Sequence, residues 1–200
     1  QGFMIREVNG IRIAITAFTK GMDGRGLPEG SEDCVNLLYT DYNSTYQKID
    51  EAGIKAVLSA INAPKPDLTI ALLHWGSEFN DQTSKSQTQL CKLLAENGVD
   101  ALIGTHPHYV QKMGFDQETG MFIAYSLGDF CGDGDKSSTN YSVLLNLEIT
   151  KDGKTGKTTI TDYDYTPIFH YEDASGRARL LRIREAMTAY EQRCIDAVPK

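Results

Sequence analysis

The chain has 200 residues, of which 40% are hydrophobic and 24% charged, and its formal net charge is −7. This length is enough for one well-buried domain, and the composition is that of a globular protein. The negative charge argues against a nucleic-acid backbone as partner, because binding there relies on clustered Lys and Arg. No apolar run approaches the ~20 residues that a membrane-spanning helix needs.

A strand hairpin is predicted at the start of the chain. Residues 3–8 and 11–18 are apolar runs rich in β-branched residues, and Asn9-Gly10 between them is typical of a type I′ turn. The glycine-rich stretch that follows, residues 20–31, is a loop by composition. It is either a lid over an active site or, more commonly for such stretches, a surface connection.

An alternation of helices and strands comes next. A helix is expected over residues 45–62 with Ser44 as its N-cap, followed by an apolar strand over 68–73. A second helix is expected over 87–96, ending at Asn97-Gly98, and a second apolar run follows it. Helices that alternate with buried strands indicate an α/β fold with a parallel sheet.

The second half of the chain has a different pattern. Residues 121–127, 141–150 and 158–169 are strand-like, with a polar hairpin loop over 151–157. A closing amphipathic helix is predicted from apolar residues at helical spacing, and four nearby arginines are interpreted as the solvated face of a helix. The apolar positions are Leu180, Ile183, Met187, Tyr190 and Cys194, and the arginines are Arg177, Arg179, Arg182 and Arg184.

The four cysteines, Cys34, Cys91, Cys131 and Cys194, are far apart and form no CxxC pair. A zinc ribbon is therefore not expected. Four cysteines allow three disulfide pairings, and the sequence does not choose among them. Because free Cys often behaves as a small buried apolar residue, structural thiols are favoured over a disulfide framework.

Three of the four histidines follow the two central apolar runs. His74 ends the first run, and His106-Pro107-His108 follows the second run after Gly104. The carboxyl ends of parallel strands meet at one edge of a sheet, where ligands bind in open α/β folds. Neutral imidazole suits Zn, Mn and Fe ions, so the sequence predicts a metal site with His74, His106 and His108 as ligands. The alternative is a polar sheet edge that happens to hold three histidines.

Three further residues are candidates for roles at this edge. Trp75 is either a packing residue or a wall of the site that contacts substrate. Glu78 is a ligand, a partner for an imidazole or a general acid/base, and otherwise a solvated acid. Asp129 could bind metal or orient a histidine, although an Asp that hydrogen-bonds its own turn is the commoner arrangement.

Three ordered motifs resemble those of a known family. They are Leu-Leu-His-Trp-Gly-Ser-Glu at 72–78, Ile-Gly-Thr-His-Pro-His-Tyr-Val-Gln at 103–111, and Tyr-Ser-Leu-Gly-Asp-Phe at 125–130. They resemble the CapA family of bacterial poly-gamma-glutamate capsule biosynthesis proteins, also called PgsA. The fold of that family resembles the calcineurin-like metallophosphoesterases, so the resemblance implies an α/β fold that is part of an αββα sandwich with a mixed sheet.

The resemblance also implies roles for individual residues. His74, His106 and His108 match histidines that bind a two-metal centre in the phosphoesterase relatives, where the metal is a divalent Mn, Zn or Fe ion. Glu78 matches the acid of a His-Trp-Gly-x-Glu motif, and Glu78 and His106 are the catalytic candidates.

The chain departs from the family pattern in two respects. Asp129 stands where the family usually shows Asn, which adds a charge near the metal. No Asp-containing first motif, Gly-Asp motif or Asn-His-Asp motif precedes His74. Residues 1–200 are therefore expected to form a single domain that corresponds to the C-terminal portion of a CapA-like domain.

Two hypotheses for function follow from the resemblance. The first is a metal-dependent hydrolase of phosphoester-like bonds that acts in capsule synthesis. The second is a non-catalytic subunit that binds the anionic capsular polymer or its membrane synthase and keeps the site as a relic. In either case the expected location is the extracellular face of the bacterial membrane, with membrane attachment only through a segment outside this chain. A plain α/β domain with a polar edge is the third alternative.

Overall fold

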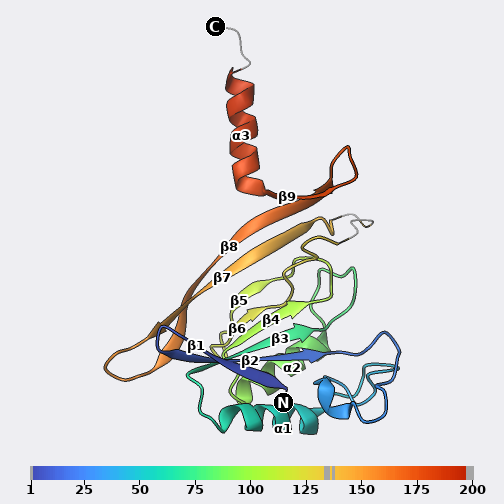
Figure 1. Ribbon diagram of the computed structural model, residues 1–200, viewed down its shortest axis with the longest axis vertical. Helices are drawn as coiled ribbons and strands as arrows, with labels where there is room; N and C mark the ends of the chain where they lie inside the picture. Colours follow the sequence, from blue (N-terminus) through green and yellow to red (C-terminus); the bar gives the residue numbers. More distant parts are fainter. Residues whose placement is uncertain (1, 133–135, 137, 197–200) are drawn as a thin grey trace.

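The computed structural model describes residues 2–132, 136 and 138–196, which form two β-sheets and flanking helices (Figure 1). Within these residues the first sheet has six strands in the order β1-β2-β3-β4-β6-β5, and the second has three in the order β7-β8-β9. The strands are β1 (Phe3–Val8), β2 (Ile11–Thr19), β3 (Leu68–His74), β4 (Ala101–Thr105), β5 (Met113–Phe115), β6 (Phe122–Ala124), β7 (Tyr141–Lys151), β8 (Thr158–Glu172) and β9 (Ala178–Arg182). The helices are the 3-10 turn η1 (Glu32–Cys34), α1 (Glu51–Asn62), α2 (Lys85–Glu96) and α3 (Ile183–Asp196).

The first sheet is mixed. Strands β2, β3, β4 and β6 are parallel to one another, whereas β1 and β5 pair antiparallel at its two edges. Asn9 and Gly10 both have positive φ, 51° and 76°, as the predicted type I′ turn between β1 and β2 requires. The predicted α/β fold with a mixed sheet is therefore confirmed.

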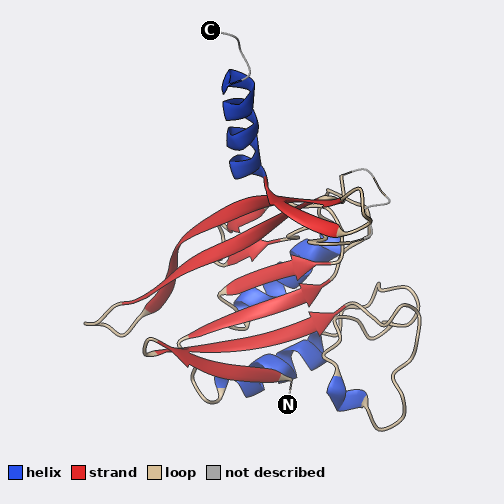
Figure 2. Cartoon of the chain, turned by 45° about the horizontal axis from the view of Figure 1, so that its top comes forward, coloured by secondary structure: helices blue, strands red, loops and turns tan. Residues whose placement is uncertain are grey.

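The elements form three layers, which Figure 2 shows from a second direction. Helices α1 and α2 cover one face of the first sheet through a core that includes Leu58, Leu90 and Leu102. On the opposite face, Phe122 and its neighbours pack against apolar residues of β7 and β8 such as Leu145. The layer order helix, sheet, sheet corresponds to three layers of the predicted αββα sandwich. None of the described helices is long and apolar enough to cross a membrane.

Helix α1 begins six residues later than predicted. The carboxylate of Asp41 accepts hydrogen bonds from the backbone of Gln47 and Lys48 and from the hydroxyl of Thr45, and these bonds hold the preceding segment in turns. The same bonds, led by that from Thr45, lower the pKa of Asp41 to about 2. Side-chain bonds to nearby backbone compete with helix formation, so the predicted start at residue 45 was wrong.

The N-cap of α1 is Asp50, and the predicted cap Ser44 was wrong. The Asp50 side chain accepts a hydrogen bond from the backbone N–H of Gly53 at 3.0 Å. A Cβ at Gly53 would lie 2.4 Å from an Asp50 carboxylate oxygen. The absence of a side chain at Gly53 therefore makes room for the Asp50 cap. Gly53 lies in the first turn of α1 and so does not weaken the middle of the helix.

The end of the chain also differs from the prediction. Leu180 lies in β9, opposite His170 of β8, and is not on a helix. Helix α3 extends away from the sheets in Figure 1, and Met187 and Tyr190 are 58% and 69% exposed. The predicted closing helix is thus a strand followed by a helix that does not cover the core.

The four arginines do not form one helix face. Arg179 and Arg182 lie in β9 and pair with Asp173 and Glu185, each at 2.9 Å. Strands β5 and β9 were not predicted, because each has only three to five residues and forms through pairing with the neighbouring strand, β6 or β8.

The structure confirms the prediction of buried free thiols only in part. Cys34, Cys91 and Cys131 are free, but only Cys91 is buried, and burial raises the pKa of its thiol to about 11. Cys34, the last residue of η1, and Cys131, in the loop between β6 and β7, are exposed. The side chain of Cys194 lies outside the part of the chain that the structure describes.

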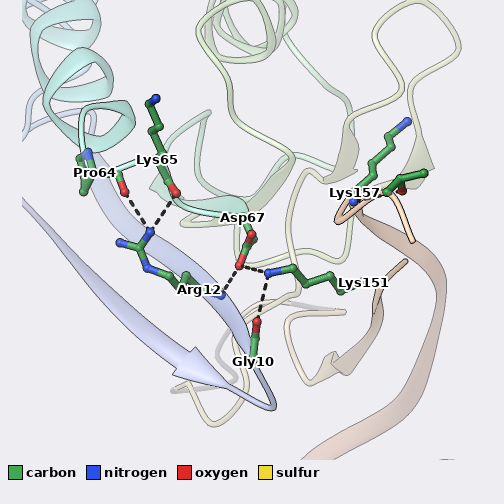
Figure 3. A network of polar contacts seen from close by, with 8 residues as sticks. Gly10, Arg12, Pro64, Lys65, Asp67, Lys151 and Lys157 are labelled. Carbon is green, nitrogen blue, oxygen red and sulfur yellow. Dashed lines mark hydrogen bonds and ion pairs between the residues drawn. The ribbon is translucent and has the colours of Figure 1, made fainter. Parts of the chain in front are cut away.

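A polar network ties the second sheet to the first (Figure 3). Lys151, at the end of β7, donates to the carboxylate of Asp67 at 2.9 Å and to the carbonyl of Gly10 at 3.1 Å. The same Asp67 oxygen accepts from the backbone N–H of Arg12 at 2.8 Å. One lysine thus joins the β7–β8 hairpin to the β1–β2 turn and to the start of β3.

We expect Lys151→Met to lower the melting temperature, because Asp67 then loses its cation while the backbone of Arg12 stays bonded. Lys157→Met is the matched control, since Lys157 is an exposed lysine of the same hairpin whose side chain is outside the contacts to Asp67 and Gly10. Differential scanning calorimetry of both variants checks this. Equal melting temperatures would contradict a role of the network in joining the sheets.

Candidate active site at the histidine edge of the first sheet

The carboxyl ends of three parallel strands bring the candidate residues together. In the sheet register Thr19 lies opposite His74, and His74 lies opposite Thr105. Lys20 directly follows β2, and His106 directly follows β4. The ends of β2, β3 and β4 therefore place a lysine and two histidines side by side.

The loop after β4 has an unusual backbone. His106 and His108 have φ values of 94° and 61°, in the left-handed region that residues with a Cβ seldom adopt. Each such residue costs roughly 1–3 kcal/mol, and surrounding contacts must hold it in place. One of these contacts is the hydrogen bond from the Phe79 backbone N–H to the Pro107 carbonyl at 2.9 Å. Strain of this kind gathers at functional sites, which agrees with the predicted role of the loop.

Gly104 is required by the packing beneath the loop. A Cβ at this position would lie 2.0 Å from the Tyr125 carbonyl oxygen and 2.4 Å from the indole nitrogen of Trp75. That indole N–H donates to the same Tyr125 carbonyl at 2.9 Å, and the Trp75 and Tyr125 rings stack at 5.6 Å. Trp75 is 0% exposed, so it supports the strand ends from within the core and cannot form a wall that contacts substrate.

We expect Gly104→Ala to destabilise the fold by ~1–3 kcal/mol or more, since the added methyl overlaps backbone and indole atoms. Gly153→Ala is the control, because a Cβ there meets nothing within 4 Å and its φ is ordinary. Urea denaturation of both variants measures the difference. If the Gly104→Ala protein is as stable as the control, the close approach of Trp75 does not require a glycine at position 104.

The imidazoles of His74 and His106 are in contact, and that of His108 lies apart. The ring centroids of His74 and His106 are 4.3 Å apart, whereas those of His106 and His108 are 6.4 Å apart. Among the side chains that the structure describes, those of residues 2–132, 136 and 138–193, no three His, Cys, Asp or Glu are arranged so that they could hold a metal ion together. The assignment of His74, His106 and His108 as ligands of one centre stays a prediction.

His108 is held by an acid and an aromatic ring. Its Nδ1 lies 2.9 Å from a carboxylate oxygen of Asp129, although neither atom makes a hydrogen bond of good geometry to any described group. The ring also stacks on Phe79 at 4.8 Å. A carboxylate beside the ring nitrogen is the arrangement expected if Asp129 orients this histidine, and that role stays a prediction.

Lys20 is a further residue of the site. Its ammonium lies 3.3 Å from Nε2 of His106, donates to the Gly76 carbonyl at 2.9 Å, and sits 4.6 Å from the centre of the Tyr46 ring. Its backbone N–H donates to the His74 carbonyl at 2.7 Å. Lys20 is thus fixed at both ends against the two histidines.

A pocket of about 290 Å³ opens in front of these groups. Its lining is Lys20, Gly21, Asp23, Tyr46, His74, Ser77, Glu78 and His106. Burial lowers the pKa of Lys20, while the carboxylates of Glu78 and Asp23 act in the opposite direction. Two acids, one ammonium and two imidazoles therefore share one small polar cavity.

The two histidines of the pocket favour their neutral form. Burial lowers the pKa of His106 to about 4, with further lowering by His74 and Lys20. Burial, followed by the charge of Lys20, also lowers the pKa of His74. Neutral imidazole is the form that can bind metal or accept a proton.

Sequence comparison identifies the family. Residues 1–134 match the sequence profile of the family described as "Bacterial capsule synthesis protein PGA_cap", and all three histidine-edge motifs lie within this range. The chain belongs to this family. The chain is also similar to the PGA biosynthesis protein CapA of Bacillus subtilis (strain 168), 29% identical over 159 residues, and to the capsule biosynthesis protein CapA of Bacillus anthracis, 27% identical over 153 residues.

The chain spans less than half the length of either relative. The two matches cover 80% and 76% of this chain but only 38% and 35% of the relatives. The resemblance to the CapA family inferred from the motifs is confirmed by the family match and by the similarity to these two CapA proteins. What the whole relatives do applies to this chain only as a proposal.

The solved structures that resemble this chain are distant from it in sequence. A hypothetical protein from Thermus thermophilus has a TM-score of 0.50 at 12% identity, covering 84% of this chain and 61% of its own. The calcineurin-like phosphoesterase YfkN from Bacillus subtilis has a TM-score of 0.41 at 15% identity, covering 82% of this chain and 49% of its own. The first of these similarities supports the α/β architecture.

The sequence interpretation missed part of the pocket. Lys20, Asp23 and Tyr46 were not singled out, because they lie in loops without a motif. One feature of the sequence indicates Lys20: it follows a β-rich run, as His74 and His106 do. If the three runs are strands of one parallel sheet, the residues that follow them lie at the same edge of that sheet.

The lowered pKa of His106 makes stability depend on pH. In the unfolded chain this histidine takes up a proton near its ordinary pKa of 6.5, whereas in the folded chain it does so only near pH 4. Between these values the unfolded state binds more protons, so stability present above pH 6.5 is lost as the pH falls towards 4. We expect His106→Gln to reduce this loss, measured with chelator present by urea denaturation at about pH 7 and about pH 5. An identical loss in both proteins would contradict burial of a neutral His106.

Proposed function

We propose that this chain carries the histidine part of a metal-dependent hydrolase site that acts on phosphoester-like bonds during synthesis of a bacterial capsular polymer. The observation that carries the proposal is the contact of the neutral His74 and His106 imidazoles at the carboxyl ends of β3 and β4, beside a polar pocket. Membership of the PGA_cap family supports capsule synthesis as the process. The outer face of the bacterial membrane is the location that this process implies.

The donor chemistry of the edge fits a divalent transition metal such as Mn, Zn or Fe. His74 and His106 have lowered pKa values and present imidazole in the form that coordinates metal, and His108 is backed by a carboxylate as ligating histidines usually are. The described residues do not assemble into a ligand set by themselves. When bound, such an ion would stabilise charge on a phosphate and lower the pKa of water.

The other residues have roles that follow from their positions. Glu78 lines the pocket beside the histidines and is the candidate general acid/base. Asp129 positions His108, and Gly104 and Trp75 hold the strand ends in register from below. The anionic capsular polymer, or the membrane synthase that makes it, is the proposed partner.

Metal content per chain is the first test. Elemental analysis of protein purified without chelator should find about one or more transition-metal ions per chain, and these should be lost in His106→Ala/His108→Ala. His170→Gln is the control for removal of an imidazole, because His170 lies in β8 and does not line the pocket. Retention of the metal in the double variant would contradict the ligand assignment.

Hydrolysis is the second test. Metal-dependent release from an aryl phosphate ester should fall at least about a hundredfold in Glu78→Gln if this acid transfers a proton, and should vanish in His106→Ala. Unaltered turnover in His106→Ala would refute the hydrolase site proposed at this edge. A wild-type chain that binds metal but releases no product would favour a polymer-binding subunit instead.

A further inference from the structure

The lone pair of His106 Nε2 is already engaged in this structure. An ammonium can only donate hydrogen bonds, so in the 3.3 Å contact with Lys20 the Nε2 atom of His106 must be the acceptor. A metal ion bound at this nitrogen needs the same lone pair. Lys20 and an ion therefore cannot both occupy Nε2 of His106.

The position of Lys20 is built by several contacts and is not that of a loose surface chain. The ammonium is also bonded to the Gly76 carbonyl and lies over the Tyr46 ring, while the backbone N–H is bonded to the His74 carbonyl. The Gly21 position requires a glycine, since a Cβ there would lie 2.3 Å from the Tyr42 carbonyl oxygen. The segment that carries Lys20 is thus fixed against the histidine pair.

The surrounding charges favour a cation in this pocket. The carboxylates of Glu78 and Asp23 line the same cavity as His74 and His106. Among the described residues of the lining, Lys20 is the only lysine or arginine, and it lies where the two acids attract its ammonium group. A pocket with two carboxylates and two imidazoles would otherwise attract a divalent ion.

We infer that Lys20 is an internal cation that occupies the metal position at His106 and thereby lowers the affinity of this site for divalent metal. Binding of an ion requires the ammonium to leave Nε2 of His106, and loss of the ion lets it return. This inference rests on the proposed function, because it takes His74 and His106 as ligands. It adds that the chain itself competes with the metal.

The test is a titration with Co²⁺, whose visible absorption reports coordination by imidazole. We expect Lys20→Met to bind Co²⁺ about tenfold or more tightly than wild type, since a like charge next to the ion is removed. Lys20→Gln, which can still donate to the Gly76 carbonyl, should show the same gain and guards against loss of folding in the methionine variant. Adding His106→Ala to Lys20→Met should abolish the gain.

Lys112→Met is the matched control. Lys112 also lies over an aromatic ring, at 5.0 Å from the centre of Tyr125, but it does not line the pocket. This variant changes the net charge by the same amount, so any general electrostatic effect appears in both proteins. If both Lys20 variants bind Co²⁺ with an affinity equal to or weaker than that of Lys112→Met, the inference is overturned. That result would not contradict the proposed metal site.

The two proposals fail in different ways. If neither wild type nor the Lys20 variants give a Co²⁺ spectrum, the proposed metal site is refuted, and the inference falls with it because there is no ion to exclude. If wild type binds and the Lys20 variants bind no better, only the inference is refuted. A gain that persists without His106 would also refute it, since the ion would then be bound elsewhere.

Discussion

The close approach of Trp75 to Gly104 is the constraint on which the histidine edge depends. The indole passes beneath β4 only because residue 104 has no side chain, and its hydrogen bond to the Tyr125 carbonyl joins the ends of β3, β4 and the segment after β6. This bond is fully buried, where a missing partner would be costly. The residues after β3 and β4 can therefore adopt strained conformations without the strands losing register.

Function at this edge then follows from which groups the parallel register brings together. The chain belongs to the PGA_cap family, and its geometry adds a polar pocket in which Lys20 lies beside the imidazoles of His74 and His106. The same pocket can be described as a metal site or as an internal ion-pair network, and the two descriptions differ in what occupies Nε2 of His106. If Lys20 controls whether a metal ion reaches Nε2 of His106, both descriptions apply to the same pocket.

Much of the fold could be predicted from local patterns. The Asn9-Gly10 turn, the capped helix before β4 and the apolar central strands are each specified within a short stretch of neighbouring residues. The start of α1 and the nature of β9 could not be predicted in the same way. The first depended on Asp41 binding backbone six and seven residues away, and the second on pairing with β8.

The sequence by itself determined the family, the α/β class and the three histidines at strand ends, because motifs and hydrophobic periods are local properties of the chain. Only the tertiary structure decided that Trp75 is buried beneath the site, that Asp129 lies beside His108, and that Lys20 joins the pocket. These facts depend on the register between strands far apart in the chain. Lys20 contacts His106, which lies 86 positions later in the chain, and the residues that flank either one in the sequence do not indicate this contact.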